Sequence, residues 1–380
     1  MLDIREITKL TELEQHREDW ERLLDTASNS EFFQTYEWLR TWLETFWADK
    51  PIAFQLISQH GQLVAMAPLL LDDRGDLKCP GSLAFPVNAH AKRTDMTCAA
   101  SPRHVLSALL DRLQKTHHPL RLSLQNVEMN SPVSQVLEET ARSAGLRVLI
   151  QGMPASALVR IDSDWERYLE SRSPHTRREM KRKRNKLDRA GLVDVRPVTE
   201  AAHCDSALDD VFQIERRTWK ERSGTSLTTE AGADRFYAEL ARRCAERGWL
   251  RIYLLYLEGQ PVAHIFGILY KNEYYALKTS YDESYRELSP GAVLFSYALE
   301  DAFSQGWSAF DFLGEESRWK NELATTARRY VSFCAFPPGA YRCRWCRTYQ
   351  QKVKPFVKAN IPAAVTLKRK LSGRFKSRAR

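Results

Sequence analysis

The tripeptide Ser289-Pro290-Gly291 has the composition of a helix start that can hold a phosphate group. Ser is a favoured N-cap, Pro suits the first helical position, and Gly lets a ligand approach the backbone. The unpaired N–H groups and the positive dipole end of a helix N-terminus attract anions such as a pyrophosphate. A well-capped helix without a ligand explains the same three residues, so both interpretations stay open at this point.

A strongly basic segment, Ser173–Lys186, is the second feature with chemical potential. At helical spacing, Arg177, Lys181 and Arg184 fall on one face. Like charges three and four positions apart repel each other, which destabilises the helix unless an anion is bound. We therefore predict that these three residues bind an anionic group of the substrate, such as a donor phosphate, a nucleotide-sugar, a lipid-linked pyrophosphate or tRNA. A solvated face that binds nothing is the alternative.

Alternating strands and helices must position both features. Around Ser289 the pattern predicts strands at 251–257, 262–270 and 274–280, a helix at 291–305 and a strand at 309–313. Further upstream it predicts two short strands, 146–150 and 157–161, on either side of a break near Gly152. Such an alternation is typical of the α/β class and places Ser289 just beyond a three-stranded antiparallel unit.

The sequence Gly-Gln-x-Val-Ala occurs twice, at Gly61–Ala65 and at Gly259–Ala263, each time in a predicted hairpin. Phe33-Gln34 and Phe212-Gln213 lie upstream of these hairpins, each assigned to a predicted Trp-bearing helix. Hairpins favour such residues by chance, but the matching context favours a duplication. The 380 residues also exceed one ordinary core. We predict an N-terminal half at 1–152, a C-terminal domain at 153–340 and a tail at 341–380.

Composition points to a soluble globular protein, with 43% hydrophobic and 28% charged residues. The start of the chain has no apolar signal segment, and no apolar run approaches the roughly 20 residues that span a bilayer. The seven Cys do not form a disulfide framework, and the lone pair Cys343 and Cys346 is too few for a structural zinc site. We predict a cytoplasmic protein without a metal.

The positive net charge of +9 belongs to the tail, because the last forty residues hold thirteen Lys or Arg and no Asp or Glu. The rest has 57 − 13 = 44 basic and 48 acidic residues. A basic tail suggests contact with an anionic membrane surface or with nucleic acid. A solubilising end is the alternative.

Several short motifs together resemble one family. They are Glu258-Gly-Gln-Pro-Val-Ala263, Tyr281-Asp282 with Tyr285, Ser289-Pro-Gly291, and Phe310-Asp-Phe-Leu-Gly-Glu315 with Lys320. Their order resembles the acetyltransferase domain of the CelD/BcsL (cellulose biosynthesis) group, which is similar to the FemAB-type transferases. The basic helix Arg177–Leu187 and the pattern Phe33-x-x-Tyr-Glu-Trp38-x-x-x-Trp42 fit the same group. The resemblance covers about residues 30 to 335.

This resemblance implies an α/β (α+β) fold of two tandem GNAT-like halves with mixed, largely antiparallel sheets. It also implies acyl-CoA as co-substrate, with Ser289, Gly291, Ala292 and Val293 as the cofactor-binding residues. The glycine pattern of the usual GNAT phosphate loop is absent, and Pro290 lacks one backbone donor. Aminoacyl-tRNA, the donor of the Fem-type relatives, is therefore the alternative donor.

In the reaction that the resemblance implies, an amine attacks a thioester or ester carbonyl. This step needs a positioned amine, a proton acceptor and donors for the oxyanion. The candidate catalytic residues are Tyr281 and Asp282 at the end of one strand, Asp311 at the end of the next, and Glu315 in the following loop. We expect both strand ends to lie at one cleft. A cap or loop hydrogen bond is the alternative role for each carboxylate.

Two further residues, Trp219 and Lys320, complete the predicted substrate-binding set. We expect His264 to be a core histidine whose hydrogen bonds are satisfied within the protein. The predicted function is transfer of an acyl group from acyl-CoA to an amine of a sugar or a cell-envelope or exopolysaccharide precursor. We expect the tail to bring the protein to the inner face of the membrane. The alternatives are a Fem-type transferase that uses aminoacyl-tRNA and an inactive GNAT-like module that binds an anionic polymer.

Overall fold

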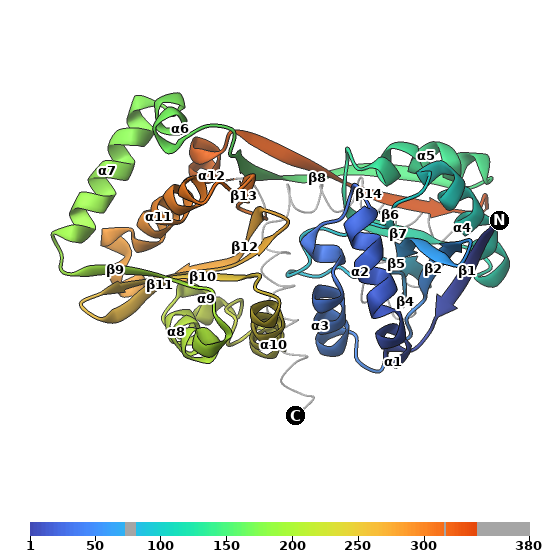
Figure 1. The fold of residues 1–380 in the computed structure, drawn as a ribbon, viewed down its shortest axis with the longest axis horizontal. Helices are drawn as coiled ribbons and strands as arrows, with labels where there is room; N and C mark the ends of the chain where they lie inside the picture. Colours follow the sequence, from blue (N-terminus) through green and yellow to red (C-terminus); the bar gives the residue numbers. More distant parts are fainter. Residues whose placement is uncertain (73–80, 315–316, 340–380) are drawn as a thin grey trace, which may run out of the picture.

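The computed structural model describes residues 1–72, 81–314 and 317–339, and every structural statement below concerns these ranges. Figure 1 shows two groups of elements joined by long strands. We call the elements up to β8 the first half and those that follow the second half. The first half contains β1 (Leu2–Ile7), α1 (Leu10–Leu13), α2 (Arg17–Thr26), α3 (Tyr36–Phe46), β2 (Phe54–Gln59), β3 (Gln62–Ala67), β4 (Leu70–Asp72), β5 (Ser82–Ala84), β6 (Thr97–Cys98), α4 (Pro102–Thr116), β7 (Leu122–Glu128), α5 (Pro132–Ser143) and β8 (Arg147–Arg160).

The second half has the same mixed α/β character. It contains α6 (Trp165–Ser171), α7 (Pro174–Asp188), β9 (Val193–Val198), α8 (Cys204–Arg216), α9 (Trp219–Ser223), α10 (Ala233–Glu246), β10 (Leu250–Leu257), β11 (Gln260–Tyr270), β12 (Glu273–Tyr281), α11 (Pro290–Ser304), β13 (Ala309–Asp311), α12 (Arg318–Leu323) and β14 (Thr326–Phe336). None of the helices in the described ranges is long and apolar enough to cross a bilayer.

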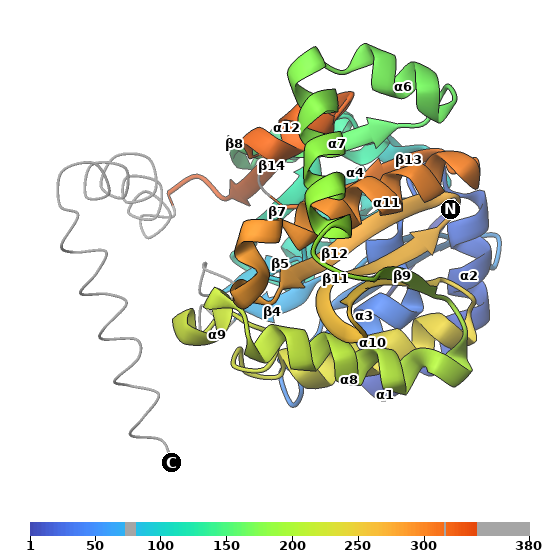
Figure 2. The same cartoon turned by 90° about the vertical axis from the view of Figure 1, so that its left-hand side faces the viewer.

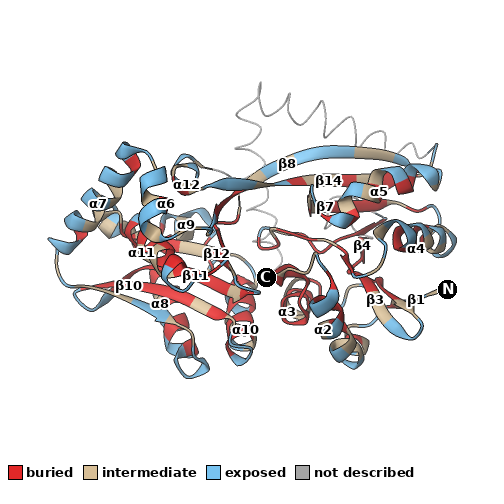
Figure 3. Cartoon of the chain, turned by 45° about the horizontal axis from the view of Figure 1, so that its top comes forward, coloured by how far each residue is buried: buried red, intermediate tan, exposed pale blue. Residues whose placement is uncertain are grey.

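The two halves share one ten-stranded sheet of order β4-β5-β7-β14-β8-β13-β12-β11-β10-β9, beside a four-stranded sheet of order β1-β2-β3-β6. The last strand, β14, lies between β7 and β8, and β8 continues to β13. Figures 1 and 3 show β8 and β14 bridging the two groups, with much of β8 exposed. Separating the halves would therefore break hydrogen-bonded strand pairs, not only a side-chain interface.

The predicted break near Gly152 is wrong, because β8 runs without interruption from Arg147 to Arg160. It pairs antiparallel with β14 over most of this length. Pro154 lies at a register shift in that pairing, which is a position where proline does not cost a ladder hydrogen bond. The division of the chain into domains at 152 and 340 stays a prediction.

Both copies of the Gly-Gln-x-Val-Ala sequence form the predicted hairpins, β2–β3 and β10–β11. Each turn has two left-handed residues, His60 and Gly61 in one and Glu258 and Gly259 in the other, as a type I′ turn requires. In each half the hairpin pairs with an earlier antiparallel strand, β1 or β9. This repeated unit supports a duplication.

The two Phe-Gln pairs upstream of the hairpins do not occupy corresponding positions in the two halves. Phe33-Gln34 lies in a 3-10 helix before α3, whereas Phe212-Gln213 lies inside α8. The resemblance between the halves is therefore carried by the sheet and its turns.

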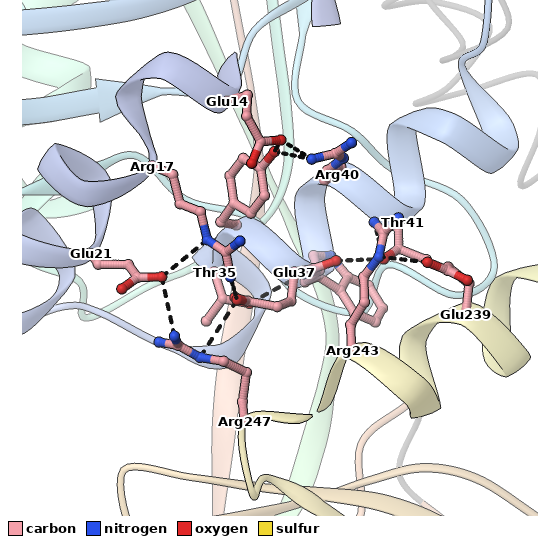
Figure 4. Close-up of polar contacts among 12 residues, drawn as sticks. Glu14, Arg17, Glu21, Thr35, Glu37, Arg40, Thr41, Glu239, Arg243 and Arg247 are labelled. Atoms are coloured by element: carbon pink, nitrogen blue, oxygen red, sulfur yellow. Dashed lines mark hydrogen bonds and ion pairs between the residues drawn. The ribbon is translucent and has the colours of Figure 1, made fainter. Parts of the chain in front are cut away.

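A single apolar core extends across the two halves on one side of the shared sheet. Trp38 of α3 packs edge-on against Phe236 of α10, with ring centroids 5.2 Å apart. Nearby, the buried Glu37 carboxylate lies 3.1 Å from Arg17 of its own half and 3.6 Å from Arg247 of the other (Figure 4). Aromatic contacts and matched charges thus fix α3 against α10.

On the second half, two helical layers cover the sheet. The core between strands β10–β12 and α11 includes Leu187 of α7, whereas α8 and α10 pack on the opposite face. Figure 2 shows α7 and α11 on one side of these strands and α8 and α10 on the other. This arrangement leaves the N-terminus of α11 at the end of β12, where the candidate site lies.

Candidate functional site

The strand pair β12–β13 opens toward the N-terminus of α11. The two strands are parallel, but only Glu273–Tyr275 of β12 pairs with β13. The remainder of β12, up to Tyr281, pairs on that side with no strand of the described residues. On its other side, the register with β11 shifts so that Leu277 is an extra, bulged residue. Bulges re-aim neighbouring groups and are common next to active sites.

The helix α11 starts where the sequence predicts, with Pro290 at its first position. The predicted capping role of Ser289 is wrong in one respect. Its side chain makes no cap hydrogen bond, because the residue takes a left-handed conformation with φ of 54°. Glycine is favoured at position 291 for a steric reason, because a Cβ there would lie 3.3 Å from Cδ1 of Tyr281. The glycine allows the Tyr281 ring to pack against the helix start.

A cavity of about 530 Å³ lies at this helix start, and we call it the α11 cavity. Its lining residues come from α7, α9, the end of β12, the segment before α11, α11 itself and α12: Lys183, Thr218, Trp219, Lys220, Thr279, Ser280, Tyr281, Arg286, Ser289, Gly291, Ala292, Phe295 and Trp319. The predicted residues Tyr281, Ser289, Gly291, Ala292 and Trp219 thus come together here.

Three cations in this cavity were not predicted as site residues: Lys183, Lys220 and Arg286. None of the described residues that line this cavity carries a carboxylate. Together with the α11 N-terminus, these cations favour an anionic group such as a phosphate. Trp219 and Trp319 are 52% and 39% exposed and offer flat apolar surfaces. The cavity therefore suits a phosphate that is attached to a ring or an apolar chain.

Behind the cavity wall, Lys220 is held by a buried polar network. Its amine donates to the carbonyl of Thr279 at 2.5 Å and to Ser280 Oγ at 2.8 Å. Ser280 Oγ in turn donates to Glu215 Oε1 at 2.5 Å, and His264 Nε2 lies 3.0 Å from the same oxygen. His264 is therefore a partnered core histidine, as expected. Burial lowers the pKa of Lys220.

The carboxylate of Glu215 is the anion of this network. Burial acts to raise its pKa, but the hydrogen bond and charge of His264 and the charge of Lys220 outweigh burial and lower it to about 2. Its second oxygen accepts a hydrogen bond from the backbone N–H of Leu227 at 3.0 Å. Burial also lowers the pKa of His264. Glu215 therefore stays ionised at neutral pH and fixes both Ser280 and Lys220.

Asp282, a predicted catalytic residue, has a local structural role. It is 4% exposed and caps the 3-10 helix Glu283–Leu288 by accepting a hydrogen bond from the N–H of Ser284 at 3.0 Å. Its other oxygen lies 3.4 Å from Arg217. Asp282 is not among the lining residues of the α11 cavity.

The expectation that Asp311 shares a cleft with Tyr281 is wrong. Asp311 pairs with Tyr275, six residues before Tyr281, because β13 aligns with the start of β12. Six residues of strand span about 20 Å. Asp311 is fully buried and binds Arg93, Arg328 and Ser156.

Asp311 also accepts a hydrogen bond at 2.7 Å from the N–H of Leu313. Lys320 Nζ donates at 2.6 Å to the Leu313 carbonyl. These two side chains thus hold the turn at Leu313 and Gly314, both of which have positive φ. Both side chains thus contact this turn, while their predicted roles in catalysis and substrate binding stay predictions.

The remaining predicted residues lie outside the cavity lining. Val293 is buried in the core below the helix start. Arg177 and Lys181 are exposed on α7, whereas Arg184 packs over the Tyr297 ring at 3.7 Å and pairs with Glu300 at 2.9 Å. Glu315, the tail at 341–380 and its two Cys lie outside the described residues. Within the described ranges, no group of three His, Cys, Asp or Glu side chains is arranged to hold a metal.

Residues 174–321 match the family model described as the acetyltransferase (GNAT) domain. This segment runs from α7 to α12 and includes every lining residue of the α11 cavity. No curated protein has a significantly similar sequence. The chain therefore carries a GNAT acetyltransferase domain, and it is an acyltransferase.

Solved structures resemble the chain over nearly its whole length. FemX aligns with a TM-score of 0.60 at 11% identity, over 92% of this chain and 99% of FemX. The C-terminal domain assigned to a lysylphosphatidylglycerol synthetase from Agrobacterium fabrum aligns with a TM-score of 0.54 at 12% identity, over 88% and 96%. L-PGS from Bacillus licheniformis gives 0.54 at 12% identity, over 87% and 94%. These similarities confirm the predicted fold of two GNAT-like halves.

Proposed function

We propose that the protein is an N-acyltransferase that binds acyl-CoA in the α11 cavity. The acceptor is an amine of a sugar or of a cell-envelope or exopolysaccharide precursor. The donor assignment rests on the cavity itself, in which three cations and a helix N-terminus converge and the described lining residues include no carboxylate. The envelope acceptor is supported by the motif order of the CelD-like group and by fold similarity to a lysylphosphatidylglycerol synthetase domain and to FemX.

In this proposal, the pyrophosphate of the donor lies against Arg286, Lys183 and the first turn of α11. The rest of the donor extends along the unpaired edge of β12 toward the bulge at Leu277. The neutral acceptor amine attacks the thioester carbonyl, so a C–N bond forms, the C–S bond breaks, and the thiolate leaves. A base or water takes the amine proton. Of the predicted catalytic side chains within the described ranges, Tyr281 lines the cavity, and we assign it as proton donor to the thiolate.

The donor assignment is tested by titrating the full chain with acetyl-CoA in a calorimeter. Replacing both Arg286 and Lys183 with Ala removes two charge-assisted contacts, each worth about 1.5–3 kcal/mol, so we expect the dissociation constant to rise at least ~10-fold. Arg178→Ala is the matched control, because Arg178 is exposed on the same helix as Lys183 and does not line the cavity. Equal affinities for the double variant and the control would refute the donor assignment.

A second candidate donor is aminoacyl-tRNA. The exposed basic surface of α7, with Arg177 and Lys181, adjoins the cavity through Lys183, and the FemX-like fold favours this reading. Binding of tRNA would fall steeply with salt because phosphate contacts release counterions. Competition between charged tRNA and acetyl-CoA, weakened by Arg177→Ala and Lys181→Ala together, would support the tRNA donor. Anionic-polymer binding without any transfer would support an inactive module instead.

We also propose that the protein is cytoplasmic and that its basic tail contacts the anionic inner face of the membrane. The proposal rests on the thirteen basic residues at 341–380 and on the absence of acidic ones there. Such a segment gains about 1 kcal/mol per basic residue near an anionic surface. Co-sedimentation with vesicles that contain phosphatidylserine tests this. Truncation after residue 340 should abolish the sedimentation, and persistence of sedimentation after truncation would contradict the proposal.

A further inference from the structure

A second cavity, of about 340 Å³, lies where the two halves meet, and we call it the junction cavity. Its volume is within the range of small-molecule sites. Its lining comes from the segment before α3, the loop before β6, the β7–α5 connection, the β11–β12 hairpin and β14: Ser28, Asn29, Ser30, Glu31, Phe33, Gln34, Arg93, Thr94, Asp95, Glu128, Asn130, Ser131, Pro132, Tyr270, Lys271, Glu273, Tyr275 and Arg328. Neither half forms this cavity alone.

The two arginines of the junction cavity are already matched by carboxylates. Arg328 forms a two-pronged pair with Glu273, one contact of which measures 2.6 Å. Arg93 contacts Glu31 at 3.0 Å and also binds Asp311. These pairs neutralise the guanidinium groups within the protein, so neither arginine has a free charge to offer a ligand.

Lys271 is a third cation of the lining, and its amine donates to the Leu24 carbonyl at 2.5 Å and to Ser30 Oγ at 2.6 Å. Glu128 is a lining carboxylate without a direct ion pair among the described residues. It lines the cavity from the end of β7, and its carboxylate makes no hydrogen bond or ion pair with another side chain of the described ranges. Burial and the nearby Glu31 raise its pKa, although the charges of Arg328 and Arg93 act in the opposite direction. Asp95, another lining carboxyl, has its pKa raised to about 7 by burial, so near pH 7 it is partly protonated. A cation is the ligand group that Glu128 lacks.

A buried donor in the same cavity also lacks a partner. Arg93 is only 3% exposed, yet its Nε has no hydrogen-bond partner within the described residues. Buried N–H groups without partners are rare and cost free energy. An oxygen of a ligand would satisfy Nε, while a positive group of the same ligand would satisfy Glu128. The cavity therefore fits a compact molecule with both an ammonium group and hydroxyl groups.

The strand β12 connects this cavity to the α11 cavity. Glu273 and Tyr275 line the junction cavity, and Thr279 to Tyr281 line the α11 cavity. The bulge at Leu277 lies between them. Four residues of strand, from Tyr275 to Thr279, span about 13 Å. A donor that extends from the α11 cavity along the open edge of β12 therefore approaches a molecule held in the junction cavity.

We propose that the junction cavity is the acceptor site and that it binds a hydroxylated primary amine of the amino-sugar class, with Glu128 as the partner of the ammonium group. This assignment rests on the proposed acyl transfer, because it identifies the cavity with the acceptor of that reaction. It differs from the donor assignment in one respect that can be measured. Binding of the amine depends on Glu128 and not on the cations of the α11 cavity.

The test is a calorimetric titration of the full chain with glucosamine, and with glucose and N-acetylglucosamine as ligands of similar shape without a cationic amine. We expect glucosamine to bind at least ~10-fold more tightly than either neutral sugar. Glu128→Gln should remove this preference, while Glu128→Asp should retain part of it. Glu139→Gln, at an exposed glutamate of α5, is the matched control and should bind glucosamine as the unaltered chain does.

Equal binding of the three sugars, no detectable binding of glucosamine, or an unchanged affinity in a folded Glu128→Gln variant would overturn the proposal. If Glu128→Gln does not fold, the Glu128→Asp affinity decides, since a carboxylate displaced by one methylene must bind the ammonium less well. Arg286→Ala separates the two assignments. This variant should weaken acetyl-CoA binding and leave glucosamine binding unchanged, because Arg286 lines the α11 cavity and not the junction cavity. Its acetyl-CoA affinity therefore tests the donor site alone.

Discussion

The two cavities at the ends of β12 differ in charge and in origin. The α11 cavity is lined by second-half residues and holds three cations, whereas the junction cavity uses both halves and combines several carboxyl groups, among them Glu128, with two paired arginines and Lys271. In the proposed reaction, this difference in charge places an anionic donor at one end of β12 and a cationic acceptor at the other. The comparison also gives the first half a role, because the junction cavity does not exist without it.

The largest expected effect is on the buried charges at the junction cavity. Asp311→Ala removes one of the two carboxylates that Arg93 and Arg328 share, the other being Glu273, and removing one partner of a buried ion pair costs about 3–5 kcal/mol. We expect the free energy of unfolding in urea to fall by about that amount. Arg93→Met combined with Asp311→Ala should recover part of the loss. An unchanged unfolding free energy with lost turnover would instead make Asp311 catalytic.

A second effect concerns the anion behind the α11 cavity. The pKa of Glu215 is about 2 in the folded chain and 4.5 ordinarily, so its stabilisation is present above pH 4.5. It is lost as pH falls through about 4.5 toward 2, because the unfolded chain binds the proton more readily. The shift corresponds to about 3 kcal/mol. Unfolding free energies measured between pH 6 and 3 should fall less steeply in Glu215→Gln than in the unaltered chain. Identical slopes would contradict this account of Glu215.

A smaller effect is expected at the rim of the α11 cavity. Trp219→Ala removes a half-exposed ring that contacts the donor in the proposed complex, and such aromatic contacts are worth about 0.5–1.5 kcal/mol. Acetyl-CoA affinity should fall ~2- to 10-fold with no change in unfolding free energy. Leu192→Ala, at an exposed apolar residue that does not line the cavity, is the control. A loss of stability without a loss of affinity would show that Trp219 serves the fold.

Local features of the fold were predictable from the sequence because short-range chemistry determines them. Gly61 and Gly259 supply the left-handed turn residues, and Pro290 marks the first position of α11. Strand register was not predictable, because it depends on pairing between distant segments. Asp311 therefore appeared to end a strand beside Tyr281, and β8 appeared to break at Gly152.

The composition of the site was only partly predictable for the same reason. Tyr281, Ser289 and Gly291 lie close together in the sequence and meet in the α11 cavity. Lys183 belongs to the basic segment 173–186, but it lies next to the helix face of Arg177, Lys181 and Arg184 that the sequence predicts to bind an anion. No sequence motif marks Lys220, because it enters the cavity only through the packing of α9 against the end of β12. The junction cavity could not be predicted from a sequence motif, because it forms only where the two halves pack together.

The most direct test of both cavities is a steady-state assay of acetyl transfer from acetyl-CoA to glucosamine, with both substrates varied. Arg286→Ala should raise the KM for acetyl-CoA and leave that for glucosamine unchanged, because it removes a cation from the α11 cavity alone. Glu128→Gln should do the reverse. Absence of transfer by the unaltered chain, or variants that change the same KM, would contradict the assignment of donor and acceptor to opposite ends of β12.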